Sequence, residues 1–157
     1  MSSGHRVVFE TERLIVRLAT ERDVDLYYSL WTDPYVMRYA GFPHGLPVTR
    51  RGLEQRLSRQ VQCEFERLLV VELKATGQSI GECKLSYPNG EGIAEPDVKL
   101  LPEFWGHKYG TEVWRALVAY EFTHTCCDSV QATPNVENVA SIKMQEAVGG
   151  VCLGEDV

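Results

Sequence analysis

The sequence predicts a mixed α/β fold of α+β character, and three observations carry that prediction. Short runs rich in β-branched residues alternate with longer stretches of helical periodicity. Pro88-Asn89-Gly90 separates two strand-like runs and is a strong hairpin signal. In the second half a strand, a helix and another strand follow in the order of a βαβ crossover. We therefore expect antiparallel hairpins first and a parallel connection later.

The first half of the chain is predicted to hold one strand and three helical segments. Thr20 and Asp23 resemble a capping box at a helix start. Leu53, Leu57 and Val61 recur every four positions and indicate one face of a later helix. The expected elements are a strand over Leu14–Leu18, a helix from Thr20 to about Trp31, a helical turn from Pro34, a loop over Ala40–Pro47 and a helix from Thr49.

The second half is predicted to hold three strands, then a helix, a short strand and a last helix. Ala140, Met144 and Val148 would face inward from the last helix. The expected elements are strands over Leu68–Leu73, Ile80–Tyr87 and Ile93–Leu101, a helix over Tyr109–His124, a strand over Val130–Thr133 and a helix over Asn138–Val148.

Composition limits the classes of protein to consider. The chain has 157 residues, enough for one domain with a real core. Its net charge of −6 argues against a nucleic-acid partner. It holds no apolar run of the ~18 residues that a membrane span needs, and no secretory signal. The five cysteines form no CxxC pair, so we expect reduced thiols, no metal and a cytoplasmic location.

The segment from Trp105 to Glu112 carries the clearest chemical signal. It reads as a glycine-bearing turn between a strand and a helix, where free N–H groups and the helix dipole can hold a phosphate. Gly106 and Gly110 allow close approach of the backbone, and Lys108 adds a positive charge. An ordinary strand-to-helix turn is the alternative, because the segment matches neither a Walker loop nor a GxGxxG fingerprint.

Around this turn the sequence resembles the GNAT N-acetyltransferase superfamily, in the branch of the ribosomal-protein N-terminal (Rim-type) acetyltransferases. The resemblance covers almost the whole chain. It lies in the order and spacing of four segments, Thr11-Glu12-Arg13-Leu14, Asp33-Pro34-Tyr35-Val36-Met37, Pro102-Glu103-Phe104-Trp105-Gly106 and Asn138-Val139-Ala140-Ser141.

The resemblance implies a single domain over residues 1–157 with a splayed central mixed sheet flanked by helices. It also implies acetyl-CoA as co-substrate and direct transfer of the acetyl group to a primary amine, on a protein N-terminus or a small molecule. Asn138 could equally be a helix cap. The residues implied to bind acetyl-CoA are Val98, Lys99, Leu100, Leu101, His107, Lys108, Tyr109, Gly110, Thr111 and Asn138.

The reaction needs a base, because an amine is mostly protonated at neutral pH. Glu95, which strand alternation places on one face with Asp97 and Lys99, is the first candidate, and Glu82 on the neighbouring strand is the second. Either could instead be a solvated strand carboxylate. Ser141 matches a residue that could protonate the departing thiolate, or it could be an exposed helix serine.

Two residues of the Ala40–Pro47 loop, Phe42 and His44, match the wall of the acceptor pocket in relatives. His44 is also a third candidate base, although loop histidines are more often merely exposed. Cys83 could suggest an acyl-enzyme, but a buried strand thiol is the more usual role.

Some features depart from the family pattern. Lys108 stands where relatives have a glycine, and its Cβ could crowd a phosphate. Pro96 removes an N–H group from the strand beside the co-substrate. The chain also stops short of the last C-terminal strand, which would leave an unpaired edge and favours a homodimer. The alternative functions are therefore a non-catalytic acyl-CoA-binding or regulatory module, or an interaction scaffold.

Overall fold

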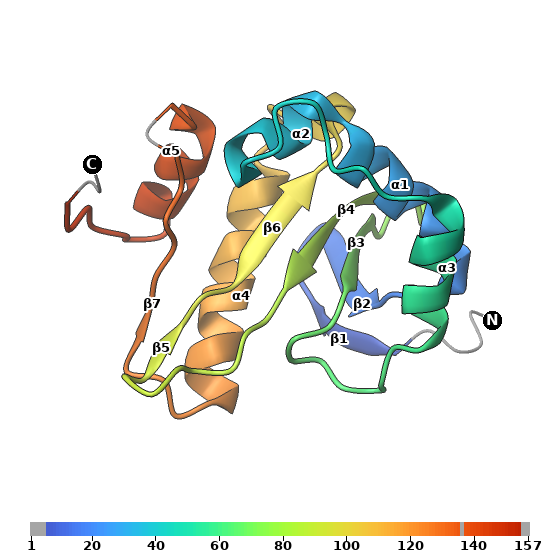
Figure 1. The fold of residues 1–157 in the computed structure, drawn as a ribbon. Helices are drawn as coiled ribbons and strands as arrows, with labels where there is room; N and C mark the ends of the chain where they lie inside the picture. The colour runs from blue at the N-terminus through green and yellow to red at the C-terminus, as the bar shows by residue number, and fades with distance from the viewer. Residues whose placement is uncertain (1–5, 136, 155–157) are drawn as a thin grey trace.

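Two β-sheets make up the centre of the computed structural model, which describes residues 6–135 and 137–154 (Figure 1). The larger sheet has the order β1-β2-β3-β4-β6, with every neighbouring pair antiparallel. The smaller sheet pairs β5 with β7 in parallel. The strands are β1 (Val7–Glu10), β2 (Leu14–Leu18), β3 (Leu69–Leu73), β4 (Ser79–Lys84), β5 (Ile93–Ala94), β6 (Asp97–Leu100) and β7 (Ser129–Val130).

Helices cover both faces of the larger sheet, with α1 and α3 on one side and α4 on the other (Figure 1). Helix α5 stands apart from the sheet and contacts α4. The helices are α1 (Val24–Thr32), α2 (Pro34–Met37), α3 (Arg50–Ser58), α4 (Tyr109–His124) and α5 (Val139–Ala147), with short 3₁₀ turns η1 (Glu21–Asp23), η2 (Arg38–Ala40) and η3 (Pro102–Phe104).

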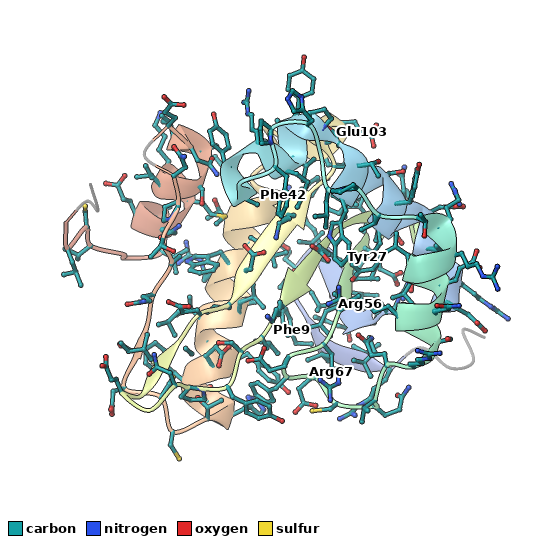
Figure 2. All side chains as sticks on the ribbon, in the orientation of Figure 1. Phe9, Tyr27, Phe42, Arg56, Arg67 and Glu103 are labelled. Atoms are coloured by element: carbon teal, nitrogen blue, oxygen red, sulfur yellow. The ribbon has the colours of Figure 1, made fainter. Side chains whose placement is uncertain are left out.

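Strand alternation divides the apolar core between these two faces. In β3, Leu69 and Val71 belong to the cluster under α4, whereas Val70 belongs to the cluster under α1 and α3. All three side chains are fully buried. Tyr27 fills the space between α1 and the sheet and donates its hydroxyl to the Leu69 carbonyl oxygen at 2.9 Å (Figure 2). The sheet is therefore a rigid platform from which β4 and β6 present their residues.

The predicted fold class is confirmed, and so is the capping box, in which Thr20 accepts from the Arg22 N–H and Asp23 accepts from the Thr20 N–H. The sequence did not reveal β1, because it is a run of only four residues whose side chains are half exposed. The helix from Thr49 ends at Ser58, so Val61 lies outside it and is 60% exposed.

Three predicted strands were too long. The strand expected over Ile80–Tyr87 ends at Lys84. The expected strand over Ile93–Leu101 is interrupted at Glu95 and Pro96, because proline has no N–H group to donate to a ladder. The predicted strand over Val130–Thr133 is reduced to Ser129–Val130. The parallel connection is thus limited to the short β5–β7 pair.

Candidate active site

The interruption at Pro96 divides this part of the structure into two arms, one made by β5 and β7 and the other by β4 and β6. Before it, β5 pairs with β7, with Ala94 opposite Val130. After it, β6 pairs with β4. In the part of the chain that the structure describes, no hydrogen bond joins residues 96–101 to the β7 arm. The arms therefore part, and the edge of β6 that faces away from β4 has no strand neighbour (Figure 1). We call the space beside this free edge, between the two arms, the gap.

The free edge of β6 presents backbone groups of alternate residues. Leu101 N–H donates to the Ile80 carbonyl oxygen at 2.9 Å, which fixes the side of β6 that faces β4. Because backbone groups alternate along an antiparallel strand, the polar groups of Val98 and the N–H of Leu100 face away from β4. The Leu100 carbonyl oxygen accepts the Trp105 indole N–H at 2.9 Å. An extended ligand chain fits this edge as an added strand would.

The turn before α4 has the conformation that a phosphate seat needs. Gly106 and Lys108 both adopt positive φ, 85° and 63°. Lys108 is the N-cap of α4 and makes no side-chain cap hydrogen bond. Among the described residues, the first N–H of the helix start with an acceptor is that of Glu112, which donates to the Lys108 carbonyl oxygen at 3.1 Å. The preceding N–H groups are available to an anion, which the positive end of the helix dipole also attracts.

Lys108 thus adopts a left-handed backbone conformation that glycine favours. A lysine in this left-handed region costs about 1–2 kcal/mol, so the rest of the turn has to hold it there. The exposed side chain leaves the backbone N–H in place. A lysine at this position therefore adds strain and charge to the turn while the turn keeps its shape.

The loop between β1 and β2 holds this turn from the other side. Glu112 accepts the Thr11 hydroxyl at 2.5 Å and the Arg13 Nε at 2.7 Å. Arg13 also donates to the His107 carbonyl oxygen at 3.1 Å and lies over the Tyr109 ring. Burial alone would raise the pKa of Glu112, but these hydrogen bonds outweigh it and lower the pKa. We call these contacts of Thr11 and Arg13 the clamp, and they join the β1–β2 loop to the turn before α4.

Glu82 lies inside the larger sheet. Its carboxylate accepts the Trp31 indole N–H at 2.9 Å and stands 3.9 Å from the Lys99 ammonium, and the residue is 6% exposed. Lys99 is also bonded to Asp97. Burial raises the pKa of Glu82 to about 7, although Lys99 and Trp31 act to lower it. The carboxyl group is therefore enclosed by protein partners.

Glu95 has the opposite setting, at the point where the two arms part. The residue is exposed, and its Oε1 accepts the Gln131 side-chain amide at 2.5 Å. Its backbone N–H donates to the Ser86 hydroxyl at 2.6 Å instead of to a strand ladder. The carboxylate is thus oriented by a neutral donor and remains accessible to a solvent-borne molecule.

The last helix, α5, carries two of the predicted residues. The Asn138 side chain accepts the Ser141 N–H at 3.2 Å, which makes it the N-cap of α5. The Ser141 hydroxyl accepts the Gln145 side-chain amide at 3.2 Å. Gly110 of α4 packs under this helix, where an added Cβ would come within 3.2 Å of the Met144 sulfur. The predicted capping role of Asn138 is therefore confirmed.

The loop with Phe42 and His44 lies beside α2, at the end of the sheet toward which β6 runs (Figures 1 and 2). Both side chains are exposed. Leu46 N–H donates to the Trp31 carbonyl oxygen at 2.6 Å, and Gly45 packs so closely on α1 that a Cβ would strike the Thr32 carbonyl. The loop is therefore fixed on the same helix that supplies the Trp31 partner of Glu82.

The remaining reactive groups do not form a second site. Burial raises the pKa of the Cys83 thiol well above its usual value, which keeps it protonated. The five cysteines are free thiols. Across residues 6–135 and 137–154 no three His, Cys, Asp or Glu side chains group as a metal site would require. No helix within those ranges is long and apolar enough to cross a bilayer.

Comparison with known proteins identifies this arrangement. The family model for the acetyltransferase (GNAT) domain matches residues 13–151. This chain belongs to the GNAT acetyltransferase family. It is therefore an acetyl-CoA-dependent N-acetyltransferase by class. The family assignment made from the turn and its flanking segments is confirmed.

Individual relatives share the fold at low sequence identity. An uncharacterised N-acetyltransferase p20 of Bacillus licheniformis is 28% identical over 137 residues, 85% of this chain and 76% of the relative. A GNAT acetyltransferase structure from Bacillus anthracis has a TM-score of 0.78 at 22% identity, covering 92% and 84% of the two chains. The spermidine N-acetyltransferase of Vibrio cholerae, in complex with CoA and spermine, has a TM-score of 0.75 at 24% identity, covering 90% and 82%.

The structure brings some predicted residues of this GNAT enzyme together and separates others. Val98, Leu100 and the turn lie along the gap between the arms, whereas Glu82 is enclosed on the α1 side of the sheet. Sequence reasoning missed the contacts that hold the site. These are the contacts of Glu112 with Thr11 and Arg13, of Glu82 with Trp31, and of Glu95 with Ser86 and Gln131. The Pro96 interruption was the one signal that could have located the last two.

Proposed function

We propose that the chain transfers an acetyl group from acetyl-CoA to the primary amine of a small cationic acceptor, by direct attack in a ternary complex. The observation that carries this proposal is the exposed Glu95 carboxylate at the parting of the two arms, beside the free edge of β6. A base placed there is within reach of an amine that enters the gap.

The residues along the gap fit acetyl-CoA. Val98 offers its backbone groups as a strand edge to the pantetheine chain, and the N–H groups from His107 to Thr111 offer a seat to its pyrophosphate. Bound there, acetyl-CoA supplies the acetyl group as a thioester. Lys99 and Leu101 of the predicted set turn their backbone groups to β4, so they support the edge from behind.

The proposed chemistry uses three groups of the chain. Glu95 takes a proton from the acceptor ammonium, and the amine nitrogen then bonds to the acetyl carbon as the carbon–sulfur bond breaks. The Leu100 N–H donates to the acetyl oxygen, where negative charge develops. The Ser141 hydroxyl passes a proton to the departing thiolate and regains one from the acylated nitrogen, which becomes the neutral amide. The products are an acetylated amine, CoA and one released proton.

A cationic acceptor is supported by charge and by a relative. The net charge is −6, and exposed Asp97 follows Glu95 closely, at the start of β6. The Vibrio cholerae relative is a spermidine N-acetyltransferase that holds spermine. Phe42 and His44, at the end of the sheet toward which β6 runs, are proposed to contact the acceptor. A polyamine is the acceptor we propose first, and the ribosomal-protein branch with a peptide N-terminus stays a prediction.

A thiol-release screen tests the proposal. Acetyl-CoA is offered with spermidine, an aminoglycoside, and peptides beginning with Ser, Ala or Thr. Because the chain itself holds five cysteines, each reaction is compared with one lacking the acceptor. We expect acceptor-dependent thiol release with spermidine and a rise in melting temperature with CoA alone. Stabilisation by CoA without turnover on any amine would indicate a non-catalytic acyl-CoA-binding module instead.

Other aspects of the function remain predictions of the sequence. The chain is proposed to work as a single domain over residues 1–157 and in the cytoplasm. A homodimer is proposed as well, and sedimentation at micromolar concentration would measure it.

A further inference from the structure

Glu95 is held in place from both arms of the structure. Its backbone is bonded on the β4 side, through Ser86, and its carboxylate on the β7 side, through Gln131. Pro96 follows directly and contributes no N–H group. These two bonds therefore fix the candidate base at a point where the ordinary strand ladder stops.

The backbone half of this arrangement is buried and tied to α4. Ser86 N–H donates to Glu121 Oε1 at 2.9 Å, while the Ser86 hydroxyl accepts the Glu95 N–H. Glu121 is fully buried and Ser86 is 8% exposed. Burial raises the pKa of Glu121, and the Ser86 N–H opposes that rise. The position of Ser86, and through it the Glu95 backbone, is therefore set by the core.

The contact to the Glu95 carboxylate comes from Gln131, whose side chain is exposed and whose backbone is held by a hydrogen bond. Gln131 N–H donates to the Ala94 carbonyl oxygen at 3.0 Å, so the residue is bound to β5, which ends directly before Glu95. Its amide Nε2 then donates to the Glu95 carboxylate. Because the Gln131 backbone is tethered to Ala94, the side chain has a short, defined reach to that carboxylate.

We propose that Gln131 is the positioning residue for the base of this enzyme, with Ser86 and Glu121 holding the backbone of the same residue. The proposal rests on the proposed role of Glu95. Gln131 occupies one carboxylate oxygen and leaves the other free to accept a proton, and as a neutral donor it adds no competing charge. A glutamate at this position would place a second carboxylate against the first.

A purely structural cross-link is the competing explanation, and it makes different predictions. A cross-link between exposed side chains alters stability slightly and has no reason to alter the pH dependence of turnover. A positioning residue alters kcat and the pH profile but leaves the binding of acetyl-CoA intact.

The experiment compares Gln131→Leu, Gln131→Asn and Gln131→Glu with the wild type. We expect Gln131→Leu to lower kcat about tenfold, with the KM for acetyl-CoA within about twofold, because a misaligned base loses transition-state contact only. In Gln131→Glu the acid limb of the kcat/KM profile should move up by about one pH unit. Gln131→Asn should recover part of the kcat lost in Gln131→Leu. The matched controls are Gln78→Leu and Gln78→Glu, in an exposed turn that contacts none of these residues.

Equal kcat values and coincident pH profiles for the wild type and Gln131→Glu would overturn the proposal. A second measurement does not depend on turnover. The carboxyl-carbon NMR signal of Glu95, assigned with Glu95→Gln, should titrate at higher pH in Gln131→Glu than in Gln78→Glu. If the wild type acetylates no amine, the proposed function fails, and an unmoved signal separately overturns the Gln131–Glu95 contact. Ser86→Ala should also lower kcat while leaving the KM for acetyl-CoA within about twofold.

Discussion

Glu82 lies in β4 and Glu95 in the break between β5 and β6, and the two are the same chemical group in opposite surroundings. Glu82 is enclosed under α1, with Trp31 and Lys99 as partners, and burial raises its pKa to about 7. Glu95 is exposed where the arms part, with Gln131 as its side-chain partner. A pKa near 7 suits a general base, but the buried Glu82 carboxyl cannot reach an acceptor amine. The Glu95 carboxylate is exposed and can reach one.

The contrast shows what decides the role of an acidic residue in this fold. Both residues sit in strand-like sequence beside apolar neighbours, and alternation alone treats them alike. The difference arises because β4 is covered on both edges by β3 and β6, while the chain at Glu95 leaves the ladder. Glu95 can therefore reach the gap because the sheet is broken there, and Glu82 is desolvated because the sheet continues on both sides of it.

The largest effect is expected from Glu95→Gln. Removing the base while keeping the size of the side chain should lower kcat by about 10²–10⁴-fold, the usual contribution of general base catalysis. The melting temperature should stay within about 2 °C, because the residue is exposed. Steady-state kinetics with the best acceptor of the screen measures the loss, and Glu91→Gln on the neighbouring exposed turn is the control. A greater loss in Glu82→Gln than in Glu95→Gln would transfer the role of base to Glu82.

The next largest effect is expected for Glu82→Gln, in the pH dependence of the free energy of unfolding. Because the folded pKa of about 7 exceeds the ordinary 4.5, the folded chain retains a proton that the unfolded chain releases between those values. The stability from this group is fully present below about pH 4.5 and is lost as the pH rises through about 7. The shift corresponds to about 3 kcal/mol.

Denaturant unfolding at pH 5 and pH 8 measures this contribution. The wild type should lose about 2–3 kcal/mol more than Glu82→Gln between the two pH values, since glutamine stays neutral. Glu95→Gln, which alters an exposed carboxyl, is the control for unrelated pH effects. An identical change in the wild type and in Glu82→Gln would contradict the burial of an ionisable group at this position.

The sequence predicts most elements of this fold because their signals are local. Pro88-Asn89-Gly90 marked a connection, Thr20 and Asp23 marked a cap, and the spacing of Leu53 and Leu57 marked a buried helix face. Each of these depends on a few adjacent residues. The family assignment likewise depended on the order of short segments.

The environment of the site was less predictable because it depends on contacts between distant residues. Trp31 and Glu82 are 51 positions apart, and Gln131 and Glu95 are 36 apart. No periodicity in one sequence reports such pairs. The clamp from Arg13 to Glu112, over 99 positions, is a third example. The candidate residues could thus be proposed from sequence, while their burial and partners required the structure.

The smallest effects, on stability and on CoA affinity, are expected from substitutions of Lys108. They test co-substrate binding independently of Glu82 and Glu95. Asparagine and glycine tolerate the positive φ of 63° better than lysine, so Lys108→Asn and Lys108→Gly should raise stability by up to about 1 kcal/mol, or about 2–4 °C in melting temperature. Lys108→Ala keeps the strain and is the matched control. If backbone N–H groups carry the phosphate, all three variants should weaken CoA binding only about two- to fivefold, because an exposed charge contributes up to ~1 kcal/mol. Calorimetric titration with CoA at low and high salt measures this, and a loss beyond tenfold in all three would assign the phosphate to the lysine side chain instead.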